Sequence, residues 1–171
     1  MPKRRLVSRE VSEARLVFGN TVHYSQVLVM EGWKWLNRVV RMIALIRCQP
    51  PPTADYALGL GNSVRFARPL KPGNLEDTAW LIHELTHVWQ FQHFGWIYLL
   101  EASQAHVYLG AEAYNYGGET GLARALKEER SLYDFNPEQQ GNICRDYYVL
   151  LKSGEPTLLW EPFIQDLRRS K

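Results

Sequence analysis

The stretch PGNLEDTAWLIHELTHVWQFQHFG, residues 72–95, predicts a single buried helix whose start and end are both marked in the sequence. Asn74 is a favourable N-cap, Glu76 and Asp77 place negative charge in the first turn, and Gly95 ends the pattern. Between these limits, apolar residues recur at the spacing of one helix face, which indicates burial against a core. These apolar residues are Leu81, Ile82, Leu85, Val88 and Trp89.

Within this helix, His83-Glu84-Leu85-Thr86-His87 reads as the motif HExxH. A separation of four residues places both imidazoles on one helix face, about one turn apart, where they can bind the same zinc ion. Glu84 then lies beside the metal and can accept a proton from a water whose pKa the metal lowers to about 7. The motif therefore predicts a zinc metallopeptidase. The alternative is a pair of hydrogen-bonded core histidines next to a solvated or paired acid.

A hydrolytic zinc site needs a third protein ligand and an open coordination position. Glu138 is the best-placed candidate, because it lies in the first turn of a second well-marked helix, NPEQQGNICRDYYVLLKSG. Glu101 and His106 are its main rivals. A glutamate in a first turn is also favoured simply by the helix dipole, so spacing alone leaves the third ligand open.

The same helix offers residues that could support such a site. Asn142 and Asp146 fall four and eight residues after Glu138, roughly along one face, and either could accept the second ring N–H of a ligand histidine. Tyr147 and Tyr148 follow them. A tyrosine hydroxyl can polarise a substrate carbonyl in zinc-assisted hydrolysis, so both are candidate electrophilic helpers. Core packing is the alternative for at least one of the two.

Beyond the HExxH motif, longer blocks of the sequence are similar to a small family of bacterial zincin-like proteins. The blocks LIHELTHVWQFQ and YDFNPEQQGNICRDYY carry this resemblance, together with the weaker blocks FGNTVHYSQV, LGLGNSVRF and YNYGGE. It extends over residues 18–154, nearly the whole chain. Proteins of this family are encoded with Rhs and VgrG components of type VI secretion and are related to the core domain of extracellular contractile injection systems. The order of the motifs also resembles that of gluzincin metallopeptidases, in which a glutamate on a second helix follows HExxH.

This resemblance implies a zincin fold that holds Zn²⁺ through His83, His87 and Glu138, with Glu84 as the catalytic base. The chain departs from the gluzincin pattern at Asn142, where that pattern often has an aspartate. The implied substrate is a protein or peptide, and the implied partner is a VgrG or Rhs component of a secretion apparatus. The main alternative is a catalytically inactive zincin-like adaptor or cargo module of such an apparatus. Glu84 favours the enzyme, because a closed structural zinc site has no use for an acid beside its histidines.

Composition argues against several other classes of protein. A formal net charge of +2 over 171 residues is too small for a typical nucleic-acid-binding domain. The cysteines Cys48 and Cys144 are far apart and outside any CxxC pattern, so neither a disulfide framework nor a thiolate zinc site is expected. No apolar run reaches the roughly 18 residues that span a bilayer, and no hydrophobic stretch follows the basic N-terminus as in a secretory signal. We expect cytoplasmic synthesis; export by a contractile secretion system would need no such signal.

The chain as a whole predicts a single α+β domain of zincin type over residues 1–171, mostly helical with a small N-terminal sheet. With 46% hydrophobic residues, it can bury roughly 70% of the surface that it exposes when unfolded. The segments outside the two site helices are expected as a flexible arm over residues 1–16, one or two strands over 17–30, a strand or hairpin arm over 57–66, a helix over 96–116 and a terminal helix over 157–171. Residues 33–47 have helical spacing but are also rich in β-branched residues, so a helix is favoured there and a strand stays the alternative.

The strand expected over residues 57–66 precedes the HExxH helix and has two readings. Beside an active-site cleft, its free edge could pair with an extended peptide substrate through backbone hydrogen bonds. Alternatively, the strand only closes the sheet.

Overall fold

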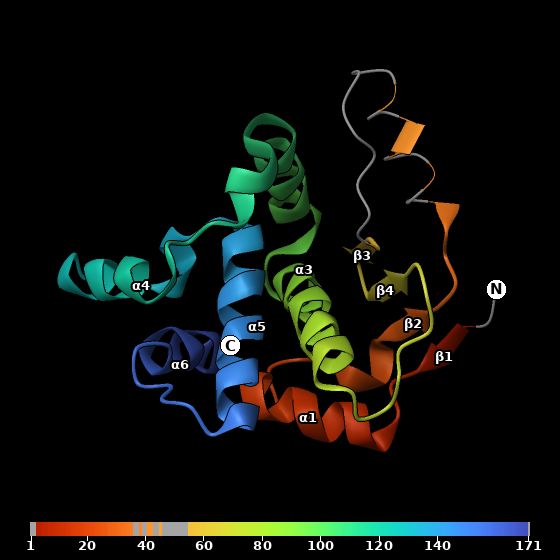
Figure 1. Cartoon of the computed structure of the whole chain (residues 1–171), viewed down its shortest axis with the longest axis horizontal. Coiled ribbons are helices and arrows are strands. Elements are labelled where there is room, and N and C mark those ends of the chain that lie inside the picture. Colours follow the sequence, from red (N-terminus) through yellow and green to blue (C-terminus); the bar gives the residue numbers. More distant parts are fainter. Residues whose placement is uncertain (1–2, 36–37, 39–40, 43–44, 46–54, 171) are drawn as a thin grey trace.

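The computed structural model describes residues 3–35, 38, 41–42, 45 and 55–170, and for residues 97–111 it describes the backbone alone. It shows an α+β fold that is mostly helical with one small sheet (Figure 1). This confirms the predicted class and the position of the sheet in the N-terminal part of the chain. The helix predicted over residues 33–47 lies mostly outside the described residues. Within the described ranges, no helix combines the length and apolar character that crossing a bilayer requires.

Four short strands form one mixed sheet in the order β1-β2-β4-β3. Their bounds are β1 Lys3–Arg5, β2 Leu28–Met30, β3 Ala57–Leu60 and β4 Ser63–Phe66. β1 is antiparallel to β2, β2 is parallel to β4, and β3 and β4 form an antiparallel hairpin. Gly61 takes a φ of 60° in the tight turn of that hairpin. β3 is therefore the outer strand of the described sheet, and it contacts α3, the helix that carries the HExxH motif.

The helices are α1 Ser8–Phe18, α3 Leu75–Leu109, α4 Gly118–Lys127, α5 Pro137–Ser153 and α6 Glu161–Arg169, and the 3₁₀ turns are η1 Tyr24–Gln26, η2 Gly110–Tyr114 and η3 Leu132–Asp134. α3 and α5 lie side by side and form the main packing pair of the molecule (Figure 1). The sheet lies on the other side of α3, and α1 crosses near the ends of α3 and α5. The two helices that carry the predicted metal ligands are thus direct neighbours.

The two site helices begin where their caps predict. At the start of α3, Asn74 Oδ1 accepts a hydrogen bond of 2.9 Å from the backbone N–H of Asp77. At the start of α5, Asn136 and Gln139 form a capping box, with reciprocal bonds of 3.0 and 3.1 Å. α3 is interrupted at Gly95, which takes a φ of 72° and a ψ of −162°, and this confirms the predicted stop. These local signals set where each helix begins and ends, and therefore where along each helix the predicted ligands lie.

The N-terminal segment is an integral part of the fold rather than the flexible arm that the sequence suggested. Arg4 on β1 forms ion pairs with Glu10 on α1 at 2.7 Å and with Glu31 after β2 at 2.9 Å. Of the residues expected as strands over 17–30, only β2 is a strand, because Val17 and Phe18 instead complete the buried face of α1. Their spacing of three and four residues from the buried Ala14 is that of one helix face.

The C-terminal segment docks as predicted. α6 follows the buried Trp160 and packs against α1 and η3. Its buried residues are Phe163, Ile164 and Leu167. The terminal helix thus covers the side of α5 and α1 away from the sheet, which completes the core around the site helices.

Candidate metal centre

His83 and His87 project from one face of α3 toward the first turn of α5, where Glu138 meets them. The Oε2 atom of Glu138 lies 3.2 Å from His83 Nε2 and 3.5 Å from His87 Nε2. One ligand atom from each of the three residues lies within 4.8 Å of the other two. The imidazole rings have centroids 5.1 Å apart and planes at 78° to each other. The structure therefore brings together the three residues that the sequence singled out as metal ligands.

The rival ligands cannot be placed in the same way. Glu101 and His106 fall in the second half of α3, whose side chains lie outside the described part of the structure. The assignment of Glu138 as the third ligand is thus supported by the position of its carboxylate, which faces both histidines.

Hydrogen bonds and neighbouring negative charges, against the effect of burial, favour a positive charge at the point where the three side chains converge. His83 is 7% exposed and His87 is 8% exposed. Burial alone would raise the pKa of Glu138, but hydrogen bonds from His83 and His87 outweigh it and hold that pKa well below its usual range. Burial alone would lower the pKa of His87, whereas its hydrogen bond to Glu138 and the neighbouring negative charges raise that pKa to about 9.

Glu84 lies beside the histidines and is almost enclosed, with 5% of its surface exposed. Burial raises the pKa of Glu84, and the charge of Glu138 adds to this effect while His83 and His87 oppose it. The backbone N–H of Gly59 in β3 donates a hydrogen bond to the Glu84 carboxylate. A carboxyl group whose pKa is raised in this way is suited to accept and release a proton near neutral pH.

The residues fit a zinc ion on two grounds. Two imidazole nitrogens and one carboxylate oxygen are a donor set that zinc takes in hydrolytic sites, where further positions stay open to water and substrate. In addition, Glu84 and Glu138 are two carboxylates held close together beside the two imidazoles, so a divalent cation would balance their negative charge. Zinc binding itself stays a prediction.

A cleft of about 490 Å³ opens over His83 and Glu84. Ala57 at the start of β3 lines one side of it, and Tyr114 from η2 and Asn142 from α5 line another. The predicted base and one predicted ligand thus line the same cleft.

Asn142 and Asp146 do not take the orienting role that the sequence suggested. Asn142 Nδ2 donates to the backbone carbonyl of Tyr114 at 2.8 Å, and its buried Oδ1 has no partner among the described residues. Asp146 accepts from the hydroxyl of Tyr116 at 2.6 Å. The neighbour of the His87 ring is instead Gln90, at 2.8 Å from Nδ1. Its signal in the sequence is a polar residue one turn after His87 in an otherwise apolar stripe.

Tyr147 and Tyr148 lie away from the three candidate ligands. Tyr147 donates to Glu161 at 3.0 Å, and Tyr148 donates to Glu13 at 2.9 Å. The reason is helical geometry, because nine and ten residues along α5 carry these side chains about 14 Å from Glu138 and onto other faces of the helix. Both hydroxyls are therefore engaged in tying α5 to neighbouring elements.

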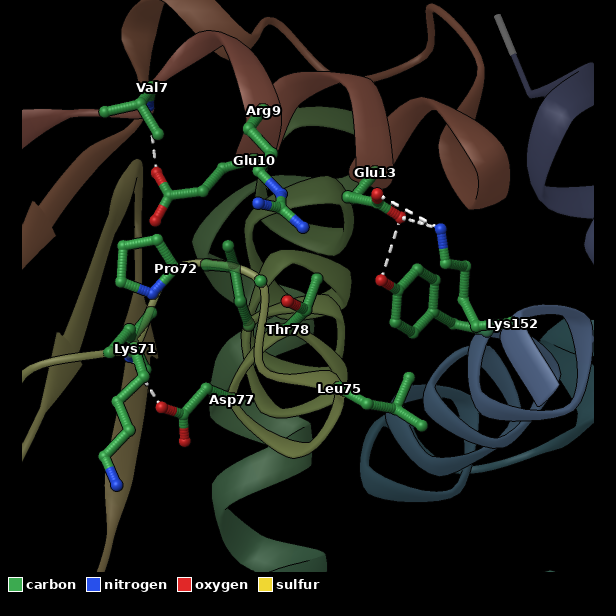
Figure 2. Close-up of a pocket in the computed structure, with 14 residues that line it drawn as sticks. Val7, Arg9, Glu10, Glu13, Lys71, Pro72, Leu75, Asp77, Thr78 and Lys152 are labelled. Atoms are coloured by element: carbon green, nitrogen blue, oxygen red, sulfur yellow. Dashed lines mark hydrogen bonds and ion pairs between the residues drawn. The ribbon is translucent and has the colours of Figure 1, made fainter.

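Tyr148 lines a separate pocket of about 190 Å³ between α1, the segment before α3 and the end of α5. Figure 2 shows Glu13 in this pocket, joined by dashed lines to Lys152, at a distance of 3.1 Å. Lys71 and Asp77 lie at its opposite side and are likewise bonded to each other (Figure 2), through the Lys71 backbone N–H at 2.6 Å. Glu13 pairs with Lys152 inside this pocket, whereas the carboxylates of Glu10 and Asp77 pair with Arg4 and Arg68, so these side chains tie α1, α3 and α5 to their neighbours.

Tyr114 lies where Tyr147 and Tyr148 were expected. Its ring stacks against the His83 imidazole, with centroids 6.1 Å apart and planes at 30°. Burial raises the pKa of Tyr114, and Glu138, which also accepts a hydrogen bond from it, raises that pKa further, so the hydroxyl keeps its proton. Sequence reasoning missed this residue because it reaches the site from a 3₁₀ turn after α3. The block YNYGGE, which begins at Tyr114, was the available signal.

Comparison with known proteins finds a relative in sequence and a similar solved structure. No family model matches the chain. The chain is 31% identical over 155 residues to the type VI secretion system spike protein VgrG2b of Pseudomonas aeruginosa, covering 85% of this chain and 13% of that protein. The chain thus spans only a small part of that relative's length. The solved effector domain of Pseudomonas aeruginosa VgrG2b resembles the structure with a TM-score of 0.53 and 22% identity, over 98% of this chain and 83% of that one.

These findings bear on the resemblance drawn from the sequence. The similarity to VgrG2b supports the connection with VgrG components of type VI secretion. At 22% identity, the structural likeness shows a shared fold and nothing about chemistry. The zincin fold and zinc chemistry stay predictions from the motif and the geometry.

Proposed function

We propose that this chain is a zinc-dependent peptidase of zincin type. The observation that carries the proposal is the convergence of His83 and His87 on the carboxylate of Glu138, at 3.2 and 3.5 Å, with Glu84 next to them in the wall of an open cleft. The first three residues would hold the ion. Because Glu84 and one ligand line the wall of a cleft, the arrangement suits a hydrolytic site better than a closed structural one.

When bound, zinc would supply Lewis acidity, lowering the pKa of water and polarising the scissile carbonyl. Glu84 accepts the proton of the attacking water and delivers it to the leaving amine. Its enclosed position supports both steps, since burial raises the pKa of Glu84 toward the range in which a carboxyl group can take up and release a proton. The hydrogen bond from Gly59 holds the carboxylate toward β3.

Tyr114 is the residue that we propose for polarising the substrate carbonyl. Its hydroxyl keeps its proton, since burial and the nearby Glu138 raise the pKa of Tyr114, and its ring lies against His83. A protonated phenol at the wall of the cleft can donate a hydrogen bond to the oxygen on which negative charge develops. This role passes to Tyr114 from Tyr147 and Tyr148 because Tyr114 lines the cleft beside His83, whereas the other two lie away from the candidate ligands, at Glu161 and Glu13.

The outer strand β3 supports a peptide as the substrate. β3 pairs with β4 on one side only within the described sheet, and its Gly59 N–H points toward Glu84. Because strand residues alternate, Ala57 turns the same backbone edge toward the cleft that it lines. An extended peptide could add to this edge and bring its scissile bond to Glu84.

We further propose that the peptidase acts as an effector, or as a processing enzyme, of type VI secretion. The support is the similarity to VgrG2b, a type VI secretion spike protein, and to the solved effector domain of that protein. A VgrG component is then the partner that we expect. Substrates inside a recipient cell or its wall would suit an effector, whereas a segment of a partner would suit a processing enzyme.

The test compares the wild type with Glu84→Gln, which keeps the shape of the side chain and removes the base. We expect equal zinc content by elemental analysis, and a loss of hydrolysis of about 10² to 10⁴-fold in screens of peptide libraries and cell-wall fragments. Glu119→Gln, an exposed change on α4, is the matched control and should behave as wild type. Equal hydrolysis by Glu84→Gln and wild type would rule out Glu84 as the base.

The same experiment separates the peptidase from the alternative of an inactive adaptor or cargo module. Stoichiometric zinc without hydrolysis of any substrate would favour the adaptor. Absence of zinc from a folded chain would reject both readings of the site.

A further inference from the structure

Gln90 and Gln140 form a buried chain of side-chain amides behind His87. Gln90 lies one turn after His87 on α3, and Gln140 lies in the first turns of α5; both have no exposed surface. The Oε1 atom of Gln90 lies 2.8 Å from His87 Nδ1. The Nε2 atom of Gln90 lies 3.1 Å from the carbonyl oxygen of Pro137 and 3.0 Å from Gln140 Oε1. Gln140 Nε2 in turn donates to the carbonyl of Phe135 at 2.8 Å.

Two backbone carbonyls fix the direction of every bond in this chain. A carbonyl oxygen can only accept, so Phe135 requires the NH₂ group of Gln140 and Pro137 requires the NH₂ group of Gln90. Turning either amide over would place two acceptors face to face in a fully buried position. Gln90 must then present its oxygen to His87.

The consequence falls on the His87 ring. Because Gln90 offers an acceptor, Nδ1 of His87 has to carry a proton. When the ring gives up its other proton, as it must to bind a metal, the lone pair is then on Nε2, the atom that faces Glu138 at 3.5 Å. The amide chain thus selects the tautomer that a metal at the three-residue site needs.

The same chain reaches the residue that precedes the third ligand. Pro137, whose carbonyl accepts from Gln90, is joined directly to Glu138 at the start of α5. Gln90 therefore bonds to one ligand on α3 and to the backbone beside another on α5. Because the amide of Gln90 is uncharged, Gln90 makes these bonds without adding a third buried carboxylate beside Glu84 and Glu138.

We infer that Gln90 is the positioning residue of the proposed zinc site, and that Gln140 holds Gln90 in its working orientation. The inference rests on the proposed function only in taking the site to bind zinc. Gln90 acts through His87 and through the first turn of α5, and it has no part in the chemical step. This role is separate from that of Asn142 and Asp146, whose polar groups are used at Tyr114 and Tyr116.

The test measures zinc affinity by competition with a chromophoric chelator. Gln90→Met preserves the length of the side chain and removes both polar groups, and we expect it to weaken zinc binding about 10 to 100-fold. Gln140→Met should give a smaller loss in the same direction. Gln92→Met is the matched control on the same helix, because Gln92 bonds Asn62 and the backbone of His23 instead, and its zinc affinity should equal that of wild type.

A second readout does not depend on the stability of any variant. Nitrogen NMR of the zinc-loaded wild type should show His87 protonated at Nδ1 and coordinated through Nε2. The opposite tautomer in wild type would overturn the inference, as would a folded Gln90→Met that binds zinc as tightly as wild type. Failure of the wild type to bind zinc at all would instead overturn the proposed function, so the two failures are distinguishable.

Discussion

Gly141 of α5 lies against the imidazole of His83, so closely that a Cβ atom at position 141 would lie 2.7 Å from Cε1 and 2.9 Å from Nδ1 of that ring. In a helix interior, alanine is otherwise favoured over glycine by about 1 kcal/mol. The glycine therefore serves the contact between the helices, not the helix itself. It allows α5 to approach α3 until Glu138, one turn earlier, reaches both histidines.

For Gly141→Ala we expect weaker zinc binding by about tenfold or more, because the new Cβ displaces the His83 ring from Glu138. Chelator competition measures the affinity, and urea unfolding with the metal removed shows whether the fold is retained. Unchanged affinity together with the stability gain of an ordinary helix position would show that the ring does not depend on this approach.

Gly59 allows a similarly close contact between β3 and α3. A Cβ there would lie 2.7 Å from His87 Cβ and 3.0 Å from the backbone oxygen of Glu84, neither of which a rotamer change can move. We expect Gly59→Ala to lower the free energy of unfolding by about 1 to 3 kcal/mol, since β3 must shift away from α3. Leu60→Ala, at a more exposed position of the same strand, is the control and should change it by roughly 0.5 kcal/mol or less.

The candidate ligands were predictable because their signals are local. His83 and His87 are on one helix, where a spacing of four residues fixes their common face, and the capping pattern at Asn136 placed Glu138 in a first turn. The caps and glycines that bound α3 and α5 are local in the same sense. Each of these predictions needed no knowledge of how the helices pack.

The supporting residues were not predictable because they depend on packing between elements. Tyr147 and Tyr148 were chosen for their chemistry, although their distance along α5 already carries them away from Glu138; only the packing of α5 shows that their partners are Glu161 and Glu13. Tyr114 reaches His83 from a turn after α3, and only the tertiary fold shows it. The helix α1 in the N-terminal segment was missed for a similar reason. It is short, and its apolar face is buried only because it packs against α3 and α5.

Substitutions of Tyr114, Tyr147 and Tyr148 test whether the residue that polarises the substrate carbonyl lies on η2 or on α5. Tyr114→Phe should reduce peptide hydrolysis by about 10²-fold or more, because it removes the donor to the developing oxyanion, and should change zinc affinity far less. Tyr147→Phe and Tyr148→Phe should leave turnover unchanged and lower the free energy of unfolding by about 1 kcal/mol each, since each loses one hydrogen bond. Loss of turnover in either of the last two, with Tyr114→Phe fully active, would restore the original assignment.

The environment of Asp77, a residue at the start of α3, predicts how the free energy of unfolding depends on pH. This buried carboxylate accepts from Arg68 and from the backbone N–H of Lys71, and the bond from Arg68, more than any other contact, lowers the pKa of Asp77. A carboxyl group with a lowered folded-state pKa contributes stability above its ordinary pKa of about 4 and loses that contribution as the pH falls through the folded-state value. The free energy of unfolding should therefore decrease on the acid side, below about pH 4.

Asp77→Asn removes the charge and should lower the free energy of unfolding at pH 7 by about 1 to 3 kcal/mol. The variant should also lose part of the acid-side slope, which urea titrations at several pH values between 2 and 7 can measure. Glu76→Gln, the neighbouring acid in the same first turn, is the control and should keep the slope. An identical pH dependence in Asp77→Asn and wild type would mean that other carboxyl groups set it.

Removal of the metal tests the site without any substitution. The three candidate ligands join α3 to α5, the main packing pair of the fold, so zinc should bind the folded chain far better than the unfolded one. At a free zinc concentration of about 100 times Kd, such binding contributes about 2.7 kcal/mol, and for a chain of this size that corresponds to a Tm shift of about 5 to 10 °C. We expect a chelator to lower Tm by this amount, readdition of zinc to restore it, and magnesium to fail, because imidazole ligands suit zinc and not magnesium. Glu138→Gln should show little of the shift, since it replaces the one oxygen ligand of the group. Coincident melting curves of the wild type with zinc and with chelator would contradict a metal bridge between the two helices.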